Sequence, residues 1–321
     1  MGKTYTGVAD FQPARDIPSL SGKIILVTGG TAGLGKGSVR AFAEHNPEHI
    51  YFTGRNAAAA KKLIADIKSK HPGVALTFIE MDLSSLRSVK TAVVKGFKHD
   101  HLHILMNNAG IIAKPPIVSV DGYEIQFATN HLGHAMLTKH LLPYLLKAAE
   151  EPNSDVRVIA NTSDGYEGHR MIKGGIAFDV LEKRSGMNRW FLGPWQRYGQ
   201  SKLANILYAA ELARRHPNIT SVVIHPGVVR TPMYDDLQGW NGLFTVVTCW
   251  LNGVKVVTPD EGILNQLWCA AGAKKSELRN GGFYRPVGID STADLKGEGA
   301  NVELAAKLWE WTDGVLAKFP N

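Results

Sequence analysis

Short apolar runs alternate with longer amphipathic stretches along most of the chain. The run at 23–28 is largely apolar and ends at a glycine cluster, and comparable runs follow it. Such runs are typical of strands that are buried on both faces of a sheet. The pattern predicts strands at residues 23–28, 49–53, 74–80, 102–106, 156–161, 219–225 and 283–287.

The stretches between these runs carry apolar residues at helical spacing, as Leu132, Met136 and Leu141 show within 126–149. They predict helices at residues 37–45, 57–70, 84–97, 126–149, 199–216 and 259–271. A strand–helix alternation repeated this often implies a parallel sheet with right-handed crossovers. We therefore predict one doubly wound α/β domain over 21–321, preceded by a polar arm at 1–20.

Composition and charge are those of an ordinary globular protein, with 44% hydrophobic and 20% charged residues. The net charge of +7 is spread along the chain without an arginine-rich run, which favours a solvated basic surface over nucleic-acid binding. Cys249 and Cys269 are too far apart in sequence to suggest a zinc site or a disulfide framework. Because the N-terminus has no apolar signal region, we predict a cytoplasmic protein.

A glycine-rich segment follows the first predicted strand directly. Gly29, Gly33 and Gly35 have the spacing G-x-x-x-G-x-G and precede a predicted helix. Glycines permit a tight turn and a close backbone approach to a pyrophosphate, and a helix N-terminus offers free N–H groups. The position between strand and helix predicts a dinucleotide-binding loop, to which we also assign Thr31 and Leu34.

The end of the second predicted strand distinguishes between two cofactors. NAD-binding proteins usually carry an acid there, about 20 residues past the loop, and an arginine accommodates the 2′-phosphate of NADP. This chain has Arg55 and no acid at residues 53–56. The sequence therefore predicts NADP(H), with a merely surface role for Arg55 as the alternative.

Tyr198 and Lys202 are four residues apart at the predicted start of a helix, and so lie on one face of it. A nearby cation favours the phenolate and would lower the tyrosine pKa from its usual value near 10. The pair therefore predicts an acid–base centre.

The order of these motifs resembles the short-chain dehydrogenase/reductase family, from about residue 20 to residue 287. The retinol-dehydrogenase-like and fungal carbonyl-reductase-like branch is the most similar, on segments 22–29, 198–205 and 258–262. The family positions matched here are the 28–35 loop, Asp82, Leu83, Asn107, Asn108, Ala109, Gly110, Asn130, Ser163, Tyr198, Lys202, Pro226, Gly227 and Thr231.

The resemblance implies roles for these residues. Tyr198 would exchange a proton with the substrate oxygen, Lys202 would hold the nicotinamide ribose, and Ser163 would hydrogen-bond the carbonyl oxygen. Asn130 would position a water for proton relay to Lys202. The residues that would contact the cofactor are Asp82 at the adenine, Thr231 at the nicotinamide amide, and Leu83, Asn108, Ala109, Gly110, Pro226, Gly227 and Val229.

Two features near the catalytic residues depart from the family pattern. The family often has two serines where this chain has Thr162 and Ser163; the strand alignment favours Ser163, with Thr162 as the alternative. The stretch before Tyr198 is longer than in compact members and contains Phe178, Trp190, Phe191 and Trp195. We interpret this insertion, about 164–197, as lying near the substrate mouth and able to cover a dimer face, which leaves a monomer and a homodimer both open. Aromatic packing on the body of the protein is the alternative.

Residues 240–251 are strongly apolar and lie where family members close a lid over the substrate, about 232–257 here. A lid of this kind implies a lipophilic substrate, and peripheral membrane contact is the less favoured alternative. Two groups of histidines are assigned no metal, because no cysteine or carboxylate cluster completes a site. His99, His101 and His103 are interpreted as a surface turn, and His131, His134 and His140 as helix-surface or packing residues.

The sequence thus predicts an NADP(H)-dependent carbonyl reductase of a ketone or aldehyde, with a lipophilic substrate of secondary metabolism. A retinol- or steroid-type alcohol dehydrogenase is the alternative within the enzyme class. A non-catalytic NADP-binding sensor is a further alternative, but such proteins usually lose the tyrosine or the lysine.

Overall fold

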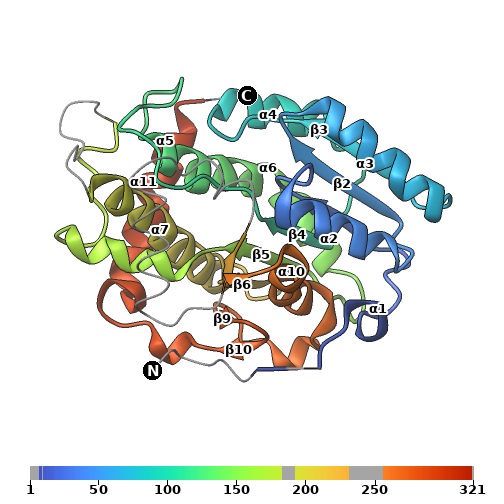
Figure 1. Ribbon diagram of the computed structural model, residues 1–321. Coiled ribbons are helices and arrows are strands. Elements are labelled where there is room, and N and C mark those ends of the chain that lie inside the picture. Colours follow the sequence, from blue (N-terminus) through green and yellow to red (C-terminus); the bar gives the residue numbers. More distant parts are fainter. Residues whose placement is uncertain (1–6, 9, 183–191, 231–255, 320–321) are drawn as a thin grey trace.

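An eight-stranded, mostly parallel sheet forms the centre of the protein (Figure 1). The computed structural model describes residues 7–8, 10–182, 192–230 and 256–319. The strand order is β10-β9-β6-β5-β4-β1-β2-β3, and only the β9–β10 pair is antiparallel. The strands are β1 (Ile24–Val27), β2 (His49–Gly54), β3 (Leu76–Glu80), β4 (Ile104–Asn107), β5 (Arg157–Asn161), β6 (Thr220–Ile224), β9 (Phe283–Arg285) and β10 (Ile289–Asp290). The predicted doubly wound α/β fold is confirmed.

Helices cover both faces of this sheet (Figure 1). They are α2 (Gly33–Ala43), α3 (Ala57–Lys70), α4 (Leu86–Gly96), α6 (Gly133–Ala149), α7 (Gly193–Arg215), α10 (Pro259–Leu267) and α11 (Val302–Ala317). Successive residues of β1 point to opposite faces: Leu26 joins the core formed with α4, α6, α7 and α11, while Ile25 and Val27 join the core formed with α2, α3 and α10. This alternation explains why the strand is apolar on both sides.

Several helix boundaries differ from the prediction. Helix α2 begins at Gly33, inside the glycine loop, and α7 begins at Gly193, six residues before the predicted start. The predicted helix at 126–149 is divided into α5 (Ile125–Phe127), a π-helical turn over Ala128–Leu132, and α6. A second π-helical turn, Trp268–Gly272, extends α10. Hydrophobic spacing over a long window locates a helix but does not reveal a single π turn within it.

Other elements were not predicted. The arm at 1–20 is polar only in part, because Phe11, Ile17 and Leu20 are buried and a short helix α1 (Pro13–Asp16) lies between them. Helix α11, beyond the residues that carried the resemblance, packs on α7, and a two-stranded sheet joins β7 (Val228–Val229) to β8 (Val256–Val257). Among the helices within the described ranges, none has the length and apolar character needed to cross a membrane.

Candidate active site

The glycine loop lies between the carboxyl end of β1 and the first turn of α2. Gly29 and Gly33 have φ values of +67° and +49°, which L side chains rarely adopt. A Cβ at Gly35 would lie 2.3 Å from the Gly29 carbonyl oxygen, so the loop can close only without that atom. The N-cap residue of α2, Ala32, makes no side-chain capping bond. The first N–H groups of α2 therefore lack a side-chain cap and fit a phosphate group.

The loop after β4 is held against this glycine loop. The Thr28 hydroxyl oxygen accepts the backbone N–H of Asn108 at 2.9 Å and that of Ala109 at 3.0 Å, and Asn108 Nδ2 donates to the Thr28 carbonyl at 2.8 Å. The Asn161 side chain, at the end of β5, donates to Asn108 Oδ1 and to Gln266 Oε1. These bonds join the carboxyl ends of three neighbouring strands, which is where open α/β sheets bind ligands.

Tyr198 and Ser163 come together as the sequence predicted. Tyr198 is 5% exposed, and a side-chain hydrogen bond joins it to Ser163. The Ser163 hydroxyl oxygen also accepts the backbone N–H of Gly165 at 3.1 Å. Thr162, the alternative, is 3% exposed, and its hydroxyl donates to the Lys202 backbone carbonyl at 2.9 Å. The geometry therefore favours Ser163 as the hydroxyl that acts beside Tyr198.

The electrostatics of the pair differ from the expectation. Burial raises the pKa of Tyr198 to about 12, and the hydrogen bond with Ser163 only partly opposes this effect. Burial also lowers the pKa of Lys202 to about 8. Lys202 Nζ lies 5.7 Å from the centre of the Tyr198 ring and donates to the Asn161 carbonyl at 3.1 Å. The predicted lowering of the Tyr198 pKa is wrong for the protein alone, because desolvation outweighs the distant ammonium.

Asn130 occupies the π-helical turn before α6 and is fully buried. Its Oδ1 accepts the Ile111 N–H at 2.8 Å, and its Nδ2 donates to the Ile111 carbonyl at 3.0 Å and to Ser201 Oγ at 2.9 Å. A Cβ at Gly110 would lie 3.2 Å from Asn130 Oδ1 and 3.4 Å from Lys202 Nζ, so these two side chains are close neighbours. Because the Asn130 amide is committed to other bonds, the predicted relay water would have to be oriented by the Asn130 backbone carbonyl, which has two lone pairs.

The remaining predicted cofactor residues lie around the same end of the sheet. Arg55, after β2, is exposed, and a Cβ at neighbouring Gly54 would lie 2.8 Å from Thr31 Oγ1. Asp82, after β3, accepts the N–H and hydroxyl of Ser84. Leu83 and Val229 are buried, whereas Leu34, Pro226 and Gly227 are half-buried. Thr231 and most of the predicted lid, including 240–251, lie outside the described residues.

The segment before Tyr198 forms one wall of the site. Its 3₁₀ helix η2 (Asp164–Met171) packs along α7, and Trp195 contacts the Tyr198 ring edge-on at 6.4 Å between centroids. Ile112 and Ala113 complete an apolar cluster with these two rings. Phe178 instead packs on Trp311 of α11. Phe178 thus packs on the body of the protein and Trp195 on Tyr198, while Trp190 and Phe191 lie outside the described residues. The position of the insertion near the substrate mouth stays a prediction.

The histidines that the sequence analysis singled out differ in how deeply they are buried. His103 is 3% exposed, and its Nδ1 accepts the Ile24 N–H at 3.1 Å, so the predicted surface turn is wrong for this residue. His131 and His134 are buried packing residues of the long helix, and His140 is half-buried. Sequence reasoning missed the bond between His134 and Thr28 because these residues belong to separate elements.

Comparison with known proteins identifies the family of this chain. The family model described as short chain dehydrogenase matches residues 23–163. A short-chain dehydrogenase/reductase of Armillaria gallica is 34% identical over 302 residues, which cover 93% of this chain and 91% of the relative. The chain belongs to the short-chain dehydrogenase/reductase family. Retinol dehydrogenase 11 of Homo sapiens is 29% identical, over 91% of this chain and 85% of its own length, and with the fungal relatives it places the chain in the retinol-dehydrogenase-like branch.

The fold of this dehydrogenase also matches solved structures. An NADPH-bound carbonyl reductase from chicken fatty liver has a TM-score of 0.57 and 24% identity, with 83% of this chain and 97% of that chain covered. This likeness supports the Rossmann fold. Membership of the family, shown by the family model and the fungal relative, supports an oxidoreductase that acts on CH–OH or C=O groups.

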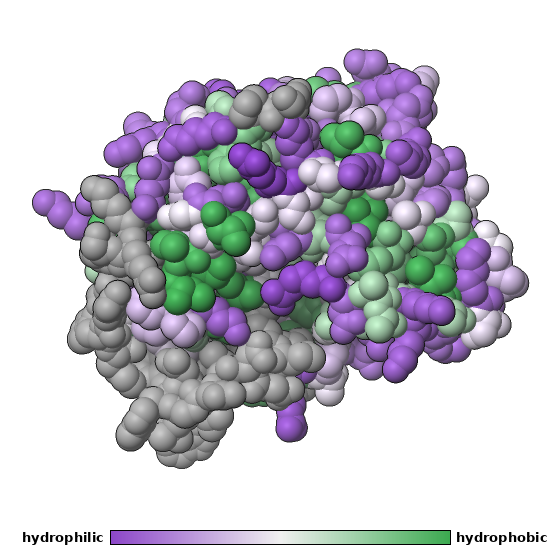
Figure 2. All heavy atoms as spheres, turned by 90° about the horizontal axis from the view of Figure 1, so that it is seen from above, coloured by the Kyte–Doolittle hydropathy of each residue, from purple (hydrophilic) through white to green (hydrophobic). Residues whose placement is uncertain are grey.

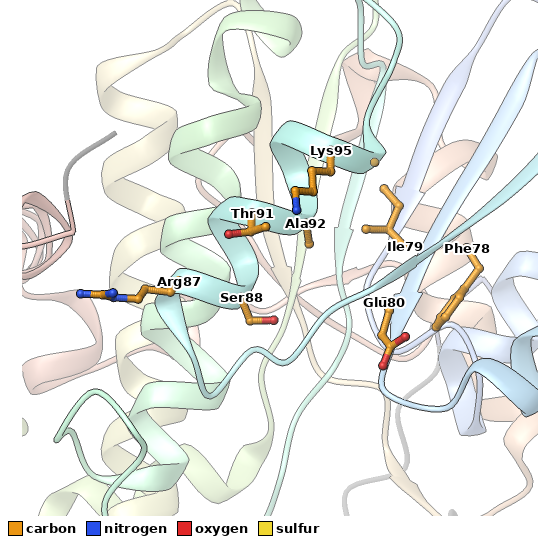
Figure 3. Close-up of a pocket in the computed structure, with 9 residues that line it drawn as sticks. Phe78, Ile79, Glu80, Arg87, Ser88, Thr91, Ala92 and Lys95 are labelled. Carbon is orange, nitrogen blue, oxygen red and sulfur yellow. The ribbon is translucent and has the colours of Figure 1, made fainter.

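A surface hollow of about 490 Å³ lies apart from the catalytic residues, between β3 and α4 (Figure 3). Glu80 lines it from the strand, and Arg87 and Lys95 line it from the helix. None of the predicted site residues within the described ranges lines this hollow, so we assign it no part in the reaction.

Proposed function

We propose that this dehydrogenase reduces the carbonyl group of a lipophilic small molecule with NADPH, or catalyses the reverse oxidation. The observation that carries the proposal is the group formed by buried Tyr198 and Lys202 with half-buried Ser163, at the end of the sheet that carries the glycine loop. A bound nicotinamide cofactor would supply the hydride. The raised pKa of Tyr198 keeps the phenol protonated at neutral pH, which is the state that donates a proton to a reduced carbonyl oxygen. The Ser163 hydroxyl oxygen accepts the Gly165 N–H, and its proton, which faces Tyr198 in the protein alone, would turn to that substrate oxygen.

The preference for NADPH rests on the end of β2. Arg55 is exposed there, the Thr31 hydroxyl is close to Gly54, and residues 53–56 contain no carboxylate that would repel a 2′-phosphate. An arginine suits a phosphate because its guanidinium donates in a fixed fork. The NADPH bound to the chicken carbonyl reductase is consistent with the same preference.

A lipophilic substrate is favoured by the apolar surroundings of Tyr198. Trp195, Ile112 and Ala113 contact or surround its ring. Figure 2 shows apolar side chains gathered on the upper face of the molecule, the face reached in Figure 1 by the loop before α5. That loop exposes Ile117 (42%) and Val120 (82%). The name of the human relative favours a retinol-type alcohol dehydrogenase as the second candidate. A role in secondary metabolism, membrane contact by residues 240–251, and the choice between monomer and homodimer stay predictions.

The test is NADPH consumption against ketones, quinones, aldehydes and retinoids, with NADH in parallel. We expect turnover with NADPH and a strong preference over NADH. Tyr198→Phe should abolish turnover and leave NADPH binding, measured by cofactor fluorescence, unchanged. Tyr208→Phe is the matched control, because Tyr208 lies on the same helix with its ring stacked on Trp309 at 4.7 Å, and it should keep full activity. Retained turnover in Tyr198→Phe would overturn the mechanism, and binding without turnover of any compound by the unchanged protein would favour a sensor.

A further inference from the structure

His134 lies in the first turn of α6, one turn after Asn130, and is 5% exposed. Its Nδ1 lies 3.0 Å from the Asn130 carbonyl oxygen, and its Nε2 lies 2.9 Å from Thr28 Oγ1. The ring therefore bridges the helix that carries the predicted relay residue and the first residue of the glycine loop. Its position is central to the site, yet neither predicted role of these helical histidines involves the reaction.

The partners of the ring determine where its proton lies. A carbonyl oxygen only accepts hydrogen bonds, so Nδ1 must carry the hydrogen. Burial lowers the pKa of His134 to about 4, and the charge of Lys202 acts in the same direction, so the ring is neutral and Nε2 accepts. The Thr28 hydroxyl then donates to Nε2 at 2.9 Å in preference to the Met106 carbonyl at 3.4 Å, and its oxygen accepts the two backbone N–H groups at Asn108 and Ala109. Every donor in this chain of bonds meets an acceptor.

We propose that His134 is a positioning residue that couples the Asn130 carbonyl to the cofactor cleft through the Thr28 hydroxyl. The Asn130 side chain is bound to Ile111 and Ser201, so the carbonyl held by His134 is the group of this residue that can orient a water toward Lys202. A shift of the backbone at Asn108 would move the Thr28 hydroxyl. The His134 imidazole would pass this movement on to the Asn130 carbonyl. The part of this inference that concerns turnover rests on the proposed function.

The test compares His134→Leu with His131→Leu. Both residues are buried in one helical segment. The Nε2 atom of each ring lies 2.9 Å from a threonine hydroxyl, which is Thr28 for His134 and Thr312 on α11 for His131. Both variants should lose stability to a similar degree. Only His134→Leu should lower kcat, by roughly tenfold to a hundredfold, with 4-nitrobenzaldehyde as the probe and a smaller change in KM. His134→Gln, which keeps a donor and an acceptor, should recover part of the loss. Equal losses of kcat in the two leucine variants would overturn the proposal.

Two measurements on the cofactor-free protein are independent of turnover. Nitrogen-15 NMR of the histidine rings, assigned by the signals missing in His134→Leu, should show a neutral ring protonated at Nδ1 at pH 7. Amide hydrogen exchange over residues 107–112 should be faster in His134→Leu than in His131→Leu, because Thr28 loses its nearer acceptor and keeps only the Met106 carbonyl at 3.4 Å. An Nε2-protonated ring, a charged ring, or equal exchange in the two variants would each refute the coupling. If the unchanged protein reduces no compound, the proposed function fails, while these two measurements still decide the role of His134.

Discussion

Replacing Lys202 with methionine should make the protein more stable and inactive. The side chain is 5% exposed, and burial lowers its pKa from 10.5 to about 8. At about 1.36 kcal/mol per pKa unit, a charge held in this position costs about 3 kcal/mol of folding free energy at pH 7. Methionine has a similar shape without the charge, and the Asn161 carbonyl keeps the Asn205 Nδ2 donor at 3.0 Å. The free energy of unfolding should therefore rise. The upper limit of the rise is about 3 kcal/mol, from which the contribution of the lost hydrogen bond between Lys202 and the Asn161 carbonyl is subtracted.

The dependence of this gain on pH tests its cause. Because the folded-state pKa is the lower one, the unfolded chain holds the proton more tightly, and the Lys202 penalty disappears as pH rises from 8 to 10.5. The stability difference between Lys202→Met and the unchanged protein should shrink from about 3 kcal/mol at pH 7 to about 1 kcal/mol at pH 10. Urea unfolding at the two pH values measures it. Lys139→Met, whose side chain is 44% exposed, should show no comparable pH dependence. A Lys202→Met difference that does not change with pH would refute the burial argument.

Two further substitutions test the predicted 2′-phosphate position and the contact between Gly165 and Tyr198. Arg55→Ala should weaken NADPH binding by roughly tenfold to a hundredfold through loss of charge-assisted hydrogen bonds, and leave NADH binding unchanged; equal effects on both cofactors in a fluorescence titration would contradict the 2′-phosphate assignment. Gly165→Ala should lower kcat at least about tenfold, because its Cβ would lie 2.9 Å from Tyr198 Cε1 and 3.3 Å from Ser163 Oγ. Gly314→Ala, where a Cβ meets nothing within 4 Å, is the control, and a Gly165→Ala protein with full turnover would show that the ring can move freely.

The sequence predicted the sheet well because buried parallel strands carry a strong local signal. All seven predicted strands are present, since runs such as 23–28 are apolar on both faces. The antiparallel strand β10 has two residues and no such pattern. Helix α11 has clear helical spacing, but it lies beyond residue 287, where the resemblance to the family ends. The site was predictable as a set of residues, and the structure brings Ser163 and Tyr198 into contact.

Sequence reasoning could not predict how the surroundings change the chemistry of the pair. The i, i+4 spacing of Tyr198 and Lys202 suggested a lowered tyrosine pKa, and the structure has the opposite direction. The spacing sets which helix face the two side chains share, whereas the pKa depends on burial by residues from distant elements. Lys202 is also turned toward the Asn161 carbonyl of β5, a partner that is 41 residues away in sequence.

The placement of Tyr198 depends on residues that have no side chain. Helix α7 lies so close to η2 that a Cβ at Gly199 would be 2.6 Å from the His169 nitrogen, and one at Gly168 would be 2.6 Å from the Trp195 carbonyl oxygen. Neither Gly168 nor Gly199 has a positive φ, so the close approach of the two elements, rather than backbone conformation, requires glycine there. Ser163 directly precedes η2, so this close approach holds the segment that follows Ser163 against the helix that carries Tyr198. A side chain at Gly168 or Gly199 would therefore push apart the two elements that bring Ser163 and Tyr198 together.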